Sequence, residues 1–248
     1  MRSADKERRV IRRWTVAAVG TILVATLAVA TTYTSLFAAS DIRVHGSDGI
    51  SSADLLAVAR VDEDSNVFHL DTGAVERRLE RDPRILEARV GKSLPDALTI
   101  EVVARTPVGV VGTEGVGTPM DLVGADGVVI GPAGNTVDLP ALLAPDGGPV
   151  GAERLATAAA AAGALDPTLR RAVDAVVVAP DGGVEVRLAA GFSASLGDAS
   201  ELTAKAASLA ALLAWVQERD VRVVSADLSV PGSPTAKLEQ GSTAVPIP

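Results

Sequence analysis

An uncharged stretch near the N-terminus constrains this chain more than any other feature. From Trp14 to Ser40 the sequence has 27 consecutive residues without a charge. As an α-helix this stretch would be about 40 Å long, more than the roughly 30 Å hydrocarbon core of a bilayer. Residues 1–13 carry six basic and two acidic residues, a bias typical of a cytoplasmic flank. The pattern predicts a cytoplasmic basic tail over 1–13, a transmembrane helix over 14–38, and the remaining residues outside the cytoplasm.

A cleaved signal peptide is the alternative interpretation of the same stretch. Arg12 and Arg13 precede the apolar run, and Ala28-Val29-Ala30 offers the small residues of a cleavage site. Because apolar residues continue as far as Phe37, an uncleaved anchor is favoured. The expected location is the cytoplasmic (inner) membrane, in a single pass.

Charge and composition exclude several classes of protein. After residue 13 the chain has 17 basic and 29 acidic residues, and the whole chain has six aromatic residues. An acidic chain with few rings is poorly suited to bind nucleic acid, which needs positive charge and stacking platforms. The absence of cysteine excludes thiol catalysis, cysteine-bound zinc and disulfides.

Residues 41–105 show the order strand, helix, helix, strand, strand. Ser51 with Asp54 resembles a capping box, and Asp71 or Thr72 can cap a second helix that ends by Pro83. The pattern then alternates, with Leu86, Ala88 and Val90 on one face, and resumes at Leu98, Ile100, Val102 and Ala104. Such alternation predicts a hairpin with one buried face.

Residues 108–230 predict a β-rich domain interrupted by helices. Glycine and Asp-Gly turns separate apolar strands, and helices are expected over about 152–162 and from near Ser200. A last strand around 236–238 is possible within a fraying tail. The six expected strands are Val108–Val111, Met120–Val123, Val128–Ile130, Val173–Val178, Val184–Leu188 and Val221–Leu228.

Several of these segments match a known pattern. These segments are Val44-His45-Gly46, Asn66–Asp71, Pro83–Val90, Leu94–Val102 and Arg105–Pro107, and further along residues 122–130, Leu139-Pro140, Leu196-Gly197, Ala226–Ser229 and Lys237-Leu238. In them the chain resembles the FtsQ/DivIB family of bacterial cell-division proteins, single-span membrane proteins with a POTRA domain. The resemblance implies an α+β fold: an N-terminal transmembrane helix, a βααββ POTRA domain over 41–107, a β-rich domain with flanking helices over 108–230, and a C-terminal tail over 231–248.

The resemblance also implies partners and a binding region. In this family the last strands of the second domain receive small single-span coiled-coil proteins of the FtsB/FtsL type. The family has aromatic residues near these strands, where this chain has valines. The candidate partner-binding residues are Val224, Ala226, Leu228, Val230 and Ser233.

Arginines on the second helix of the POTRA segment form another candidate surface. Arg77 and Arg81 belong to a local basic patch in an acidic domain. One interpretation is a docking face for a partner. The other is a solvated helix face on which Glu76 and Glu80 pair with basic neighbours.

The sequence contains no complete motif for catalysis, cofactor binding or metal binding. Gly91-Lys92-Ser93 lacks the earlier glycine of a phosphate-binding loop, and Gly191–Ser195 lacks the second glycine of a nucleophile elbow. The two histidines, His45 and His69, have no metal-site spacing. The chain is therefore expected to be no enzyme and to bind no cofactor, metal or small-molecule substrate.

The sequence thus favours a bitopic scaffold of the bacterial division septum that recruits and links other division proteins. Two alternatives stay open: a POTRA-containing receptor in membrane-protein insertion, and an exported hydrolase with an unrecognised site.

Overall fold

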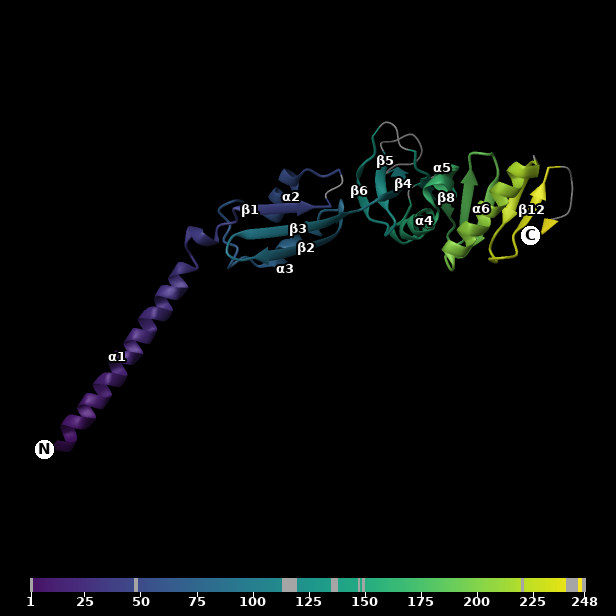
Figure 1. The fold of residues 1–248 in the computed structure, drawn as a ribbon. Helices are drawn as coiled ribbons and strands as arrows, with labels where there is room; N and C mark the ends of the chain where they lie inside the picture. Colours follow the sequence, from purple (N-terminus) through teal and green to yellow (C-terminus); the bar gives the residue numbers. More distant parts are fainter. Residues whose placement is uncertain are drawn as a thin grey trace. The chain divides into compact units, whose positions relative to one another are not determined.

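The computed structural model describes residues 2–46, 49–112, 120–134, 138–146, 148, 150–219, 221–239 and 245–246, with side chains except at 2–13, 15–16, 35 and 245–246. The chain forms two compact units, which we call unit 1 (Met1–Ala104) and unit 2 (Arg105–Pro248). Figure 1 labels many of their elements.

Unit 1 begins with a helix, α1 (Arg2–Thr31), followed by the short 3-10 helix η1 (Ser35–Phe37). α1 ends at Thr31, so the last seven residues of the predicted transmembrane helix over 14–38 are not part of it. Within the described part of the chain, no helix combines the length and the apolarity needed to cross a membrane. The prediction of a transmembrane helix is corrected accordingly.

The segment that follows α1 contacts the folded part of unit 1 directly. The Tyr33 ring stacks on His69 at 4.2 Å, and Phe37 meets Phe68 edge to face at 5.4 Å. The Asn66 amide donates to the Thr32 carbonyl over 2.8 Å, and Thr32 Oγ1 lies 3.0 Å from His69 Nε2. His69, considered above as a possible metal ligand, therefore lies at a packed junction.

The rest of unit 1 is a three-stranded sheet with two helices. Its order is β1-β3-β2, with β1 parallel to β3 and β2 antiparallel to it. The predicted βααββ order is confirmed, as is its α+β class. The elements are β1 (Asp41–His45), α2 (Ser52–Ala59), α3 (Thr72–Leu79), β2 (Ile85–Ser93) and β3 (Ala97–Ala104).

The predicted caps begin α2 and α3. Ser51 Oγ accepts from the Asp54 N–H over 3.1 Å, and Asp71 Oδ1 accepts from the Ala74 N–H over 3.0 Å. Such caps satisfy N–H groups that the first helical turn leaves without partners. The helices bury their apolar faces on one side of the sheet, in a core that includes Leu55, Ala59, Val75, Leu79, Ile85, Leu98, Ile100 and Val102.

One face assignment in the hairpin is wrong. Leu86 was expected on the buried face with Ala88 and Val90, but Leu86 is exposed and Ile85 is buried. The β2–β3 register shifts between Ile85 and Glu87. A β-bulge inserts one extra residue and so reverses the alternation at that point.

Unit 2 is built on a ten-stranded sheet of order β13-β12-β11-β10-β9-β8-β7-β4-β5-β6. All six predicted strands occur in it. The strands are β4 (Pro107–Gly112), β5 (Met120–Gly124), β6 (Val129–Pro132), β7 (Ala141–Leu143), β8 (Val173–Val178), β9 (Val184–Leu188), β10 (Ser193–Gly197), β11 (Val223–Asp227), β12 (Thr235–Leu238) and β13 (Val245–Pro246).

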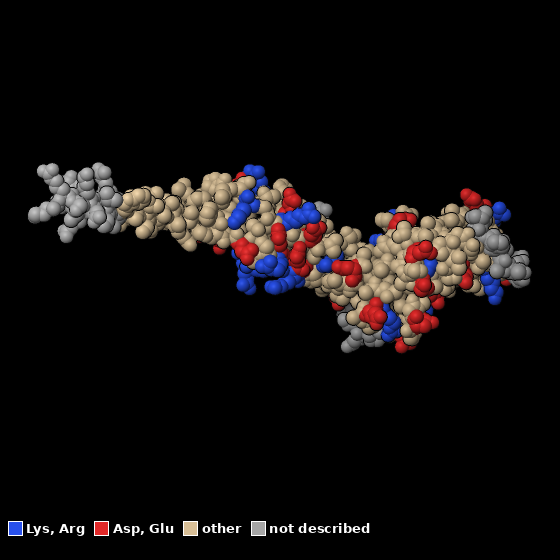
Figure 2. Space-filling view, turned by 90° about the horizontal axis from the view of Figure 1, so that it is seen from below, with Lys and Arg blue, Asp and Glu red and all other residues tan. Residues whose placement is uncertain are grey.

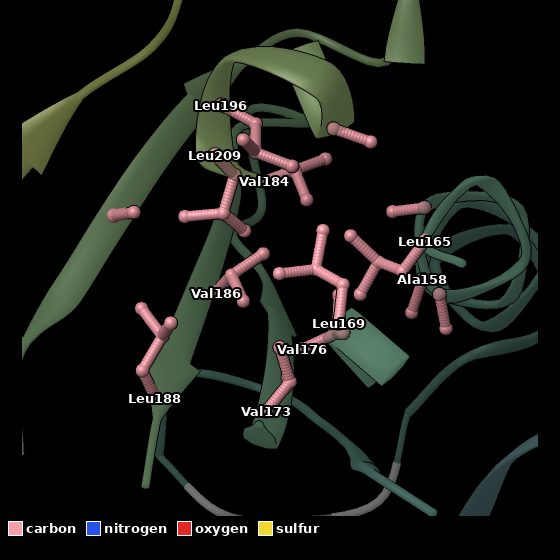
Figure 3. Packing of buried hydrophobic residues seen from close by; sticks show 14 of the residues in the cluster. Ala158, Leu165, Leu169, Val173, Val176, Val184, Val186, Leu188, Leu196 and Leu209 are labelled. Carbon is pink, nitrogen blue, oxygen red and sulfur yellow. The ribbon is translucent and has the colours of Figure 1, made fainter. Parts of the chain in front are cut away.

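Three helices accompany this sheet, and two of them were expected. They are α4 (Ala152–Ala164), α5 (Pro167–Arg171) and α6 (Leu202–Arg219). Figure 3 shows Ala158 and Leu165 of the α4 region, Leu169 of α5 and Leu209 of α6 pointing toward apolar strand residues. The buried side chains of α4 are mostly alanines, and small side chains let a helix backbone approach a sheet closely. This core fixes the strands that carry the candidate site.

Candidate partner-binding surfaces

The predicted binding strand, β11, lies inside the sheet. It runs parallel to β10 on one side and antiparallel to β12 on the other. The Leu228 N–H donates to the Ser195 carbonyl over 2.8 Å. Because backbone groups alternate in direction along a strand, Ala226 also turns its N–H and C=O toward β10. The outer positions beyond β11 belong to β12 and β13.

The five candidate residues of this region divide into exposed and buried side chains. Val224 is 49% exposed and Val230 is 60% exposed, and Ser233 is also exposed. Ala226 and Leu228 are buried in the core, at 7% and 0% exposure. The structure thus leaves Val224, Val230 and Ser233 with side chains that a partner can reach.

A turn after β11 sets the direction of the segment that carries Val230. Asp227 Oδ1 accepts from the Ser229 N–H over 2.9 Å, which is an Asx-type turn. Hydrogen bonds from Ser229, through its side chain first and its backbone second, lower the pKa of Asp227. Asp227 is therefore an ionised acceptor at neutral pH, and the turn that presents Val230 stays closed.

A cavity of about 430 Å³ adjoins Val224. Its rim includes Arg222 and Glu239, whose Nη1 and Oε2 lie 3.6 Å apart. Sequence reasoning missed this cavity, because its walls come from segments far apart in the chain: the turn before β10, α6, the start of β11 and the residue after β12. Its apolar lining comprises Ala190, Gly191, Phe192, Val216, Val221, Val223 and Val224. The cavity therefore offers a partner both apolar surface and a pair of opposite charges.

Arg77 of α3 and Arg81, which lies just after that helix, form the second candidate surface. Arg77 and Arg81 are exposed, and Arg77 Nη2 lies 4.0 Å from Asp71 Oδ2. Figure 2 shows basic side chains gathered on unit 1 with acidic side chains among them. A pair this exposed contributes little to stability, so the two arginines are available for binding.

The glutamates beside these arginines act on the backbone of β2. Glu76 Oε1 accepts from the Val90 N–H over 2.8 Å, and Glu80 Oε1 accepts from the Ala88 N–H over 3.5 Å. β2 is an edge strand of its sheet, so these carboxylates occupy donors that another strand would need. These contacts do not support the other interpretation, in which Glu76 and Glu80 serve mainly as ion-pair partners on a solvated helix face.

Among the described residues, no group of three or more His, Asp or Glu side chains is arranged to hold a metal ion. The glycine-lysine-serine run lies on β2, where Lys92 Nζ donates to the carbonyls of Phe68 at 3.1 Å and Leu70 at 3.2 Å. Gly191–Ser195 leads into β10. Both runs are therefore parts of the sheets: the first lies on β2, and the second leads into β10.

Comparisons with known proteins agree with the motifs. Residues 37–105 match the family model described as POTRA domain, FtsQ-type. The chain is 36% identical over 119 residues to "Cell division protein FtsQ" of Syntrophotalea carbinolica, covering 43% of this chain and 42% of that protein. It is 29% identical over 140 residues to the protein of the same name from Corynebacterium glutamicum, covering 50% of this chain and 60% of that protein.

The chain thus spans about half the length of the curated relatives that it matches. The matched residues, 37–105, include the segments with the strongest motif agreement, Pro83–Val90 and Leu94–Val102. The resemblance expected from these motifs is confirmed: the chain contains an FtsQ-type POTRA domain and is similar over about half of its length to two proteins named "Cell division protein FtsQ".

Proposed function

We propose that this chain acts in bacterial cell division as a scaffold, binding other division proteins through the surface around β11 and β12 and through Arg77 and Arg81. The observation that carries the proposal is the exposed Val224, which lines a cavity of about 430 Å³, together with the exposed Val230 beyond the end of β11. An exposed apolar side chain with a hollow beside it is a common feature of protein-binding surfaces. The similarity of the chain to cell-division proteins supports the same role.

The proposed partners are small coiled-coil division proteins of the FtsB/FtsL type. A helix from such a protein can insert an apolar side chain into the cavity beside Val224, and an extended segment can add to the sheet near β12. In this proposal the function rests on binding rather than on catalysis. We place the chain at the division septum, in association with the membrane. As domains, we propose the POTRA domain over 41–107, the β-rich domain over 108–230 and a tail over 231–248, the last of which carries β12 and β13.

Charged substitutions at the two valines test this surface. In the double variant Val224→Arg, Val230→Arg, the affinity for FtsB/FtsL-type partners should fall at least tenfold, because two cations would face an apolar partner surface. Both side chains are half exposed or more, so the free energy of unfolding should change by less than about 1 kcal/mol. The measurement is a pull-down with purified partner proteins, together with thermal unfolding of each variant.

Val129→Arg is the matched control. Val129 is a 40% exposed valine on β6, at the other end of the sheet order from β12. It should leave binding unchanged. Equal loss of binding in the control and in the double variant, or full binding by the double variant, would contradict the proposed surface.

In cells, a fluorescent fusion should form a midcell band, and depletion should give filaments; dispersed label with normal division would contradict the septal role.

A further inference from the structure

The outer edge of β12 is occupied by a segment of the same chain. β13, which consists of Val245 and Pro246, pairs antiparallel with β12 and forms the last strand in the sheet order. Ala236 lies opposite Val245, and Thr235 lies opposite Pro246. A sheet edge that ends in so short a strand is a weakly held one.

The register determines which backbone groups face this edge. Ala226 turns its N–H and C=O toward β10, as shown by the Leu228 to Ser195 bond, so Asp227 turns its groups toward β12. Thr235 lies opposite Asp227 and faces β11 in return. Ala236 therefore points its N–H and C=O away from β11, toward β13. Val245 lies opposite Ala236, so the N–H and C=O groups of the two residues face each other.

The sequence of the short strand fits this arrangement. Pro246 has no N–H, and it lies opposite Thr235, whose backbone groups face β11. The position therefore requires no donor from residue 246, and proline is tolerated at an edge under that condition. Val245, which must supply a donor, is not a proline.

We infer that Val245–Pro246 caps the edge of β12 in cis, so that an extended segment from another protein adds to β12 only after the tail is released. The inference rests on the proposed function, in which partners bind near β12. A tethered segment competes at an effective concentration of about 1 mM for a short linker. A two-residue strand held in this way can be displaced by a segment that binds β12 more tightly. The tail therefore excludes segments that bind β12 weakly.

The test compares the full chain with a chain truncated after Glu239. The first readout is hydrogen exchange of the Ala236 amide. It should become at least tenfold faster on truncation, because the acceptor supplied by Val245 is lost. Unchanged exchange would overturn the inference. This readout needs no partner protein, so its failure is distinct from failure of the septal role, which the valine variants test.

The second readout uses a synthetic peptide with the sequence of residues 241–248 as the added strand. We expect it to bind the truncated chain at least tenfold more tightly than the full chain. Val245→Pro in the full chain should act like truncation, because it removes the donor to Ala236. Pro246→Ala is the matched control and should leave Ala236 protected. Equal peptide affinity for the full and truncated chains would overturn the inference.

Discussion

Gly46→Ala is expected to destabilise unit 1 by about 3 kcal/mol. Gly46 has a φ of +75°, in the left-handed region that glycine adopts without strain. A Cβ at this position would also clash with the backbone carbonyl oxygen of Val102 on β3. A backbone atom in the middle strand of a sheet cannot move aside, so the clash must be relieved by separating β1 from β3. The measurement is urea unfolding followed by circular dichroism.

Gly49→Ala is the control for this prediction. Gly49 has a φ of +80°, and an added Cβ there would meet no atom within 4 Å. It should therefore cost only the conformational term, about 1 kcal/mol. Equal destabilisation by the two substitutions would show that the close approach of Gly46 to β3 contributes nothing.

Lys205→Ala is expected to destabilise unit 2 by about 3 kcal/mol. The Lys205 side chain is 1% exposed, on the inner face of α6. Its Nζ donates to the Asp198 carbonyl over 2.9 Å and to Asp198 Oδ1 over 2.8 Å. Alanine would leave a cavity where the aliphatic stem lay and remove the donor that holds the loop between β10 and α6. Lys205→Met retains the stem and should cost less, and equal losses would contradict the assignment of part of the effect to packing.

The same contact predicts a pH dependence. The hydrogen bond from the Lys205 ammonium, with those from Ser200, holds the pKa of Asp198 far below its usual value. A lowered pKa in the folded state adds stability that is present above the unfolded-state pKa, about 3.9, and is lost as the pH falls toward the folded-state pKa. The urea midpoint should therefore fall more between pH 5 and pH 2.5 in the wild type than in Lys205→Met. Parallel curves would contradict the link between Asp198 and Lys205.

The local elements of unit 1 could be predicted because their determinants lie close together in the sequence. Ser51 and Asp71 cap helices by accepting from the N–H groups three residues later. In an alternating strand, the apolar residues themselves indicate which face is buried. The failures have equally local causes. The bulge between Ile85 and Glu87 has no glycine or proline to mark it, and β10 has an alternation of serine and alanine that is only weakly apolar.

The length of α1 was misjudged for a different reason. An uncharged run can be counted from the sequence, but where its helix ends depends on contacts. Thr32 and Tyr33 engage Asn66 and His69, residues more than thirty positions away. The sequence alone could not show that the last part of the run leaves the helix to make these contacts.

For the candidate site, the sequence offered candidate residues but not their geometry. Val224 and Val230 were named and are exposed, whereas Ala226 and Leu228 were named and are buried. Strand order decides this difference, since β11 lies between β10 and β12. Order arises from pairing between distant segments, as does the cavity that joins Phe192, Val216 and Val224. No local sequence pattern encodes the strand order or the cavity.

Glu76 and Glu80 bear on how the molecule behaves when many copies are crowded together. At high local density, an open edge strand would join one copy of the chain to the next in a ladder. In this chain, carboxylates from α3 accept the outward N–H groups of Ala88 and Val90. Copies that meet at this edge find its donors already engaged, so crowding does not turn the POTRA sheet into a polymer.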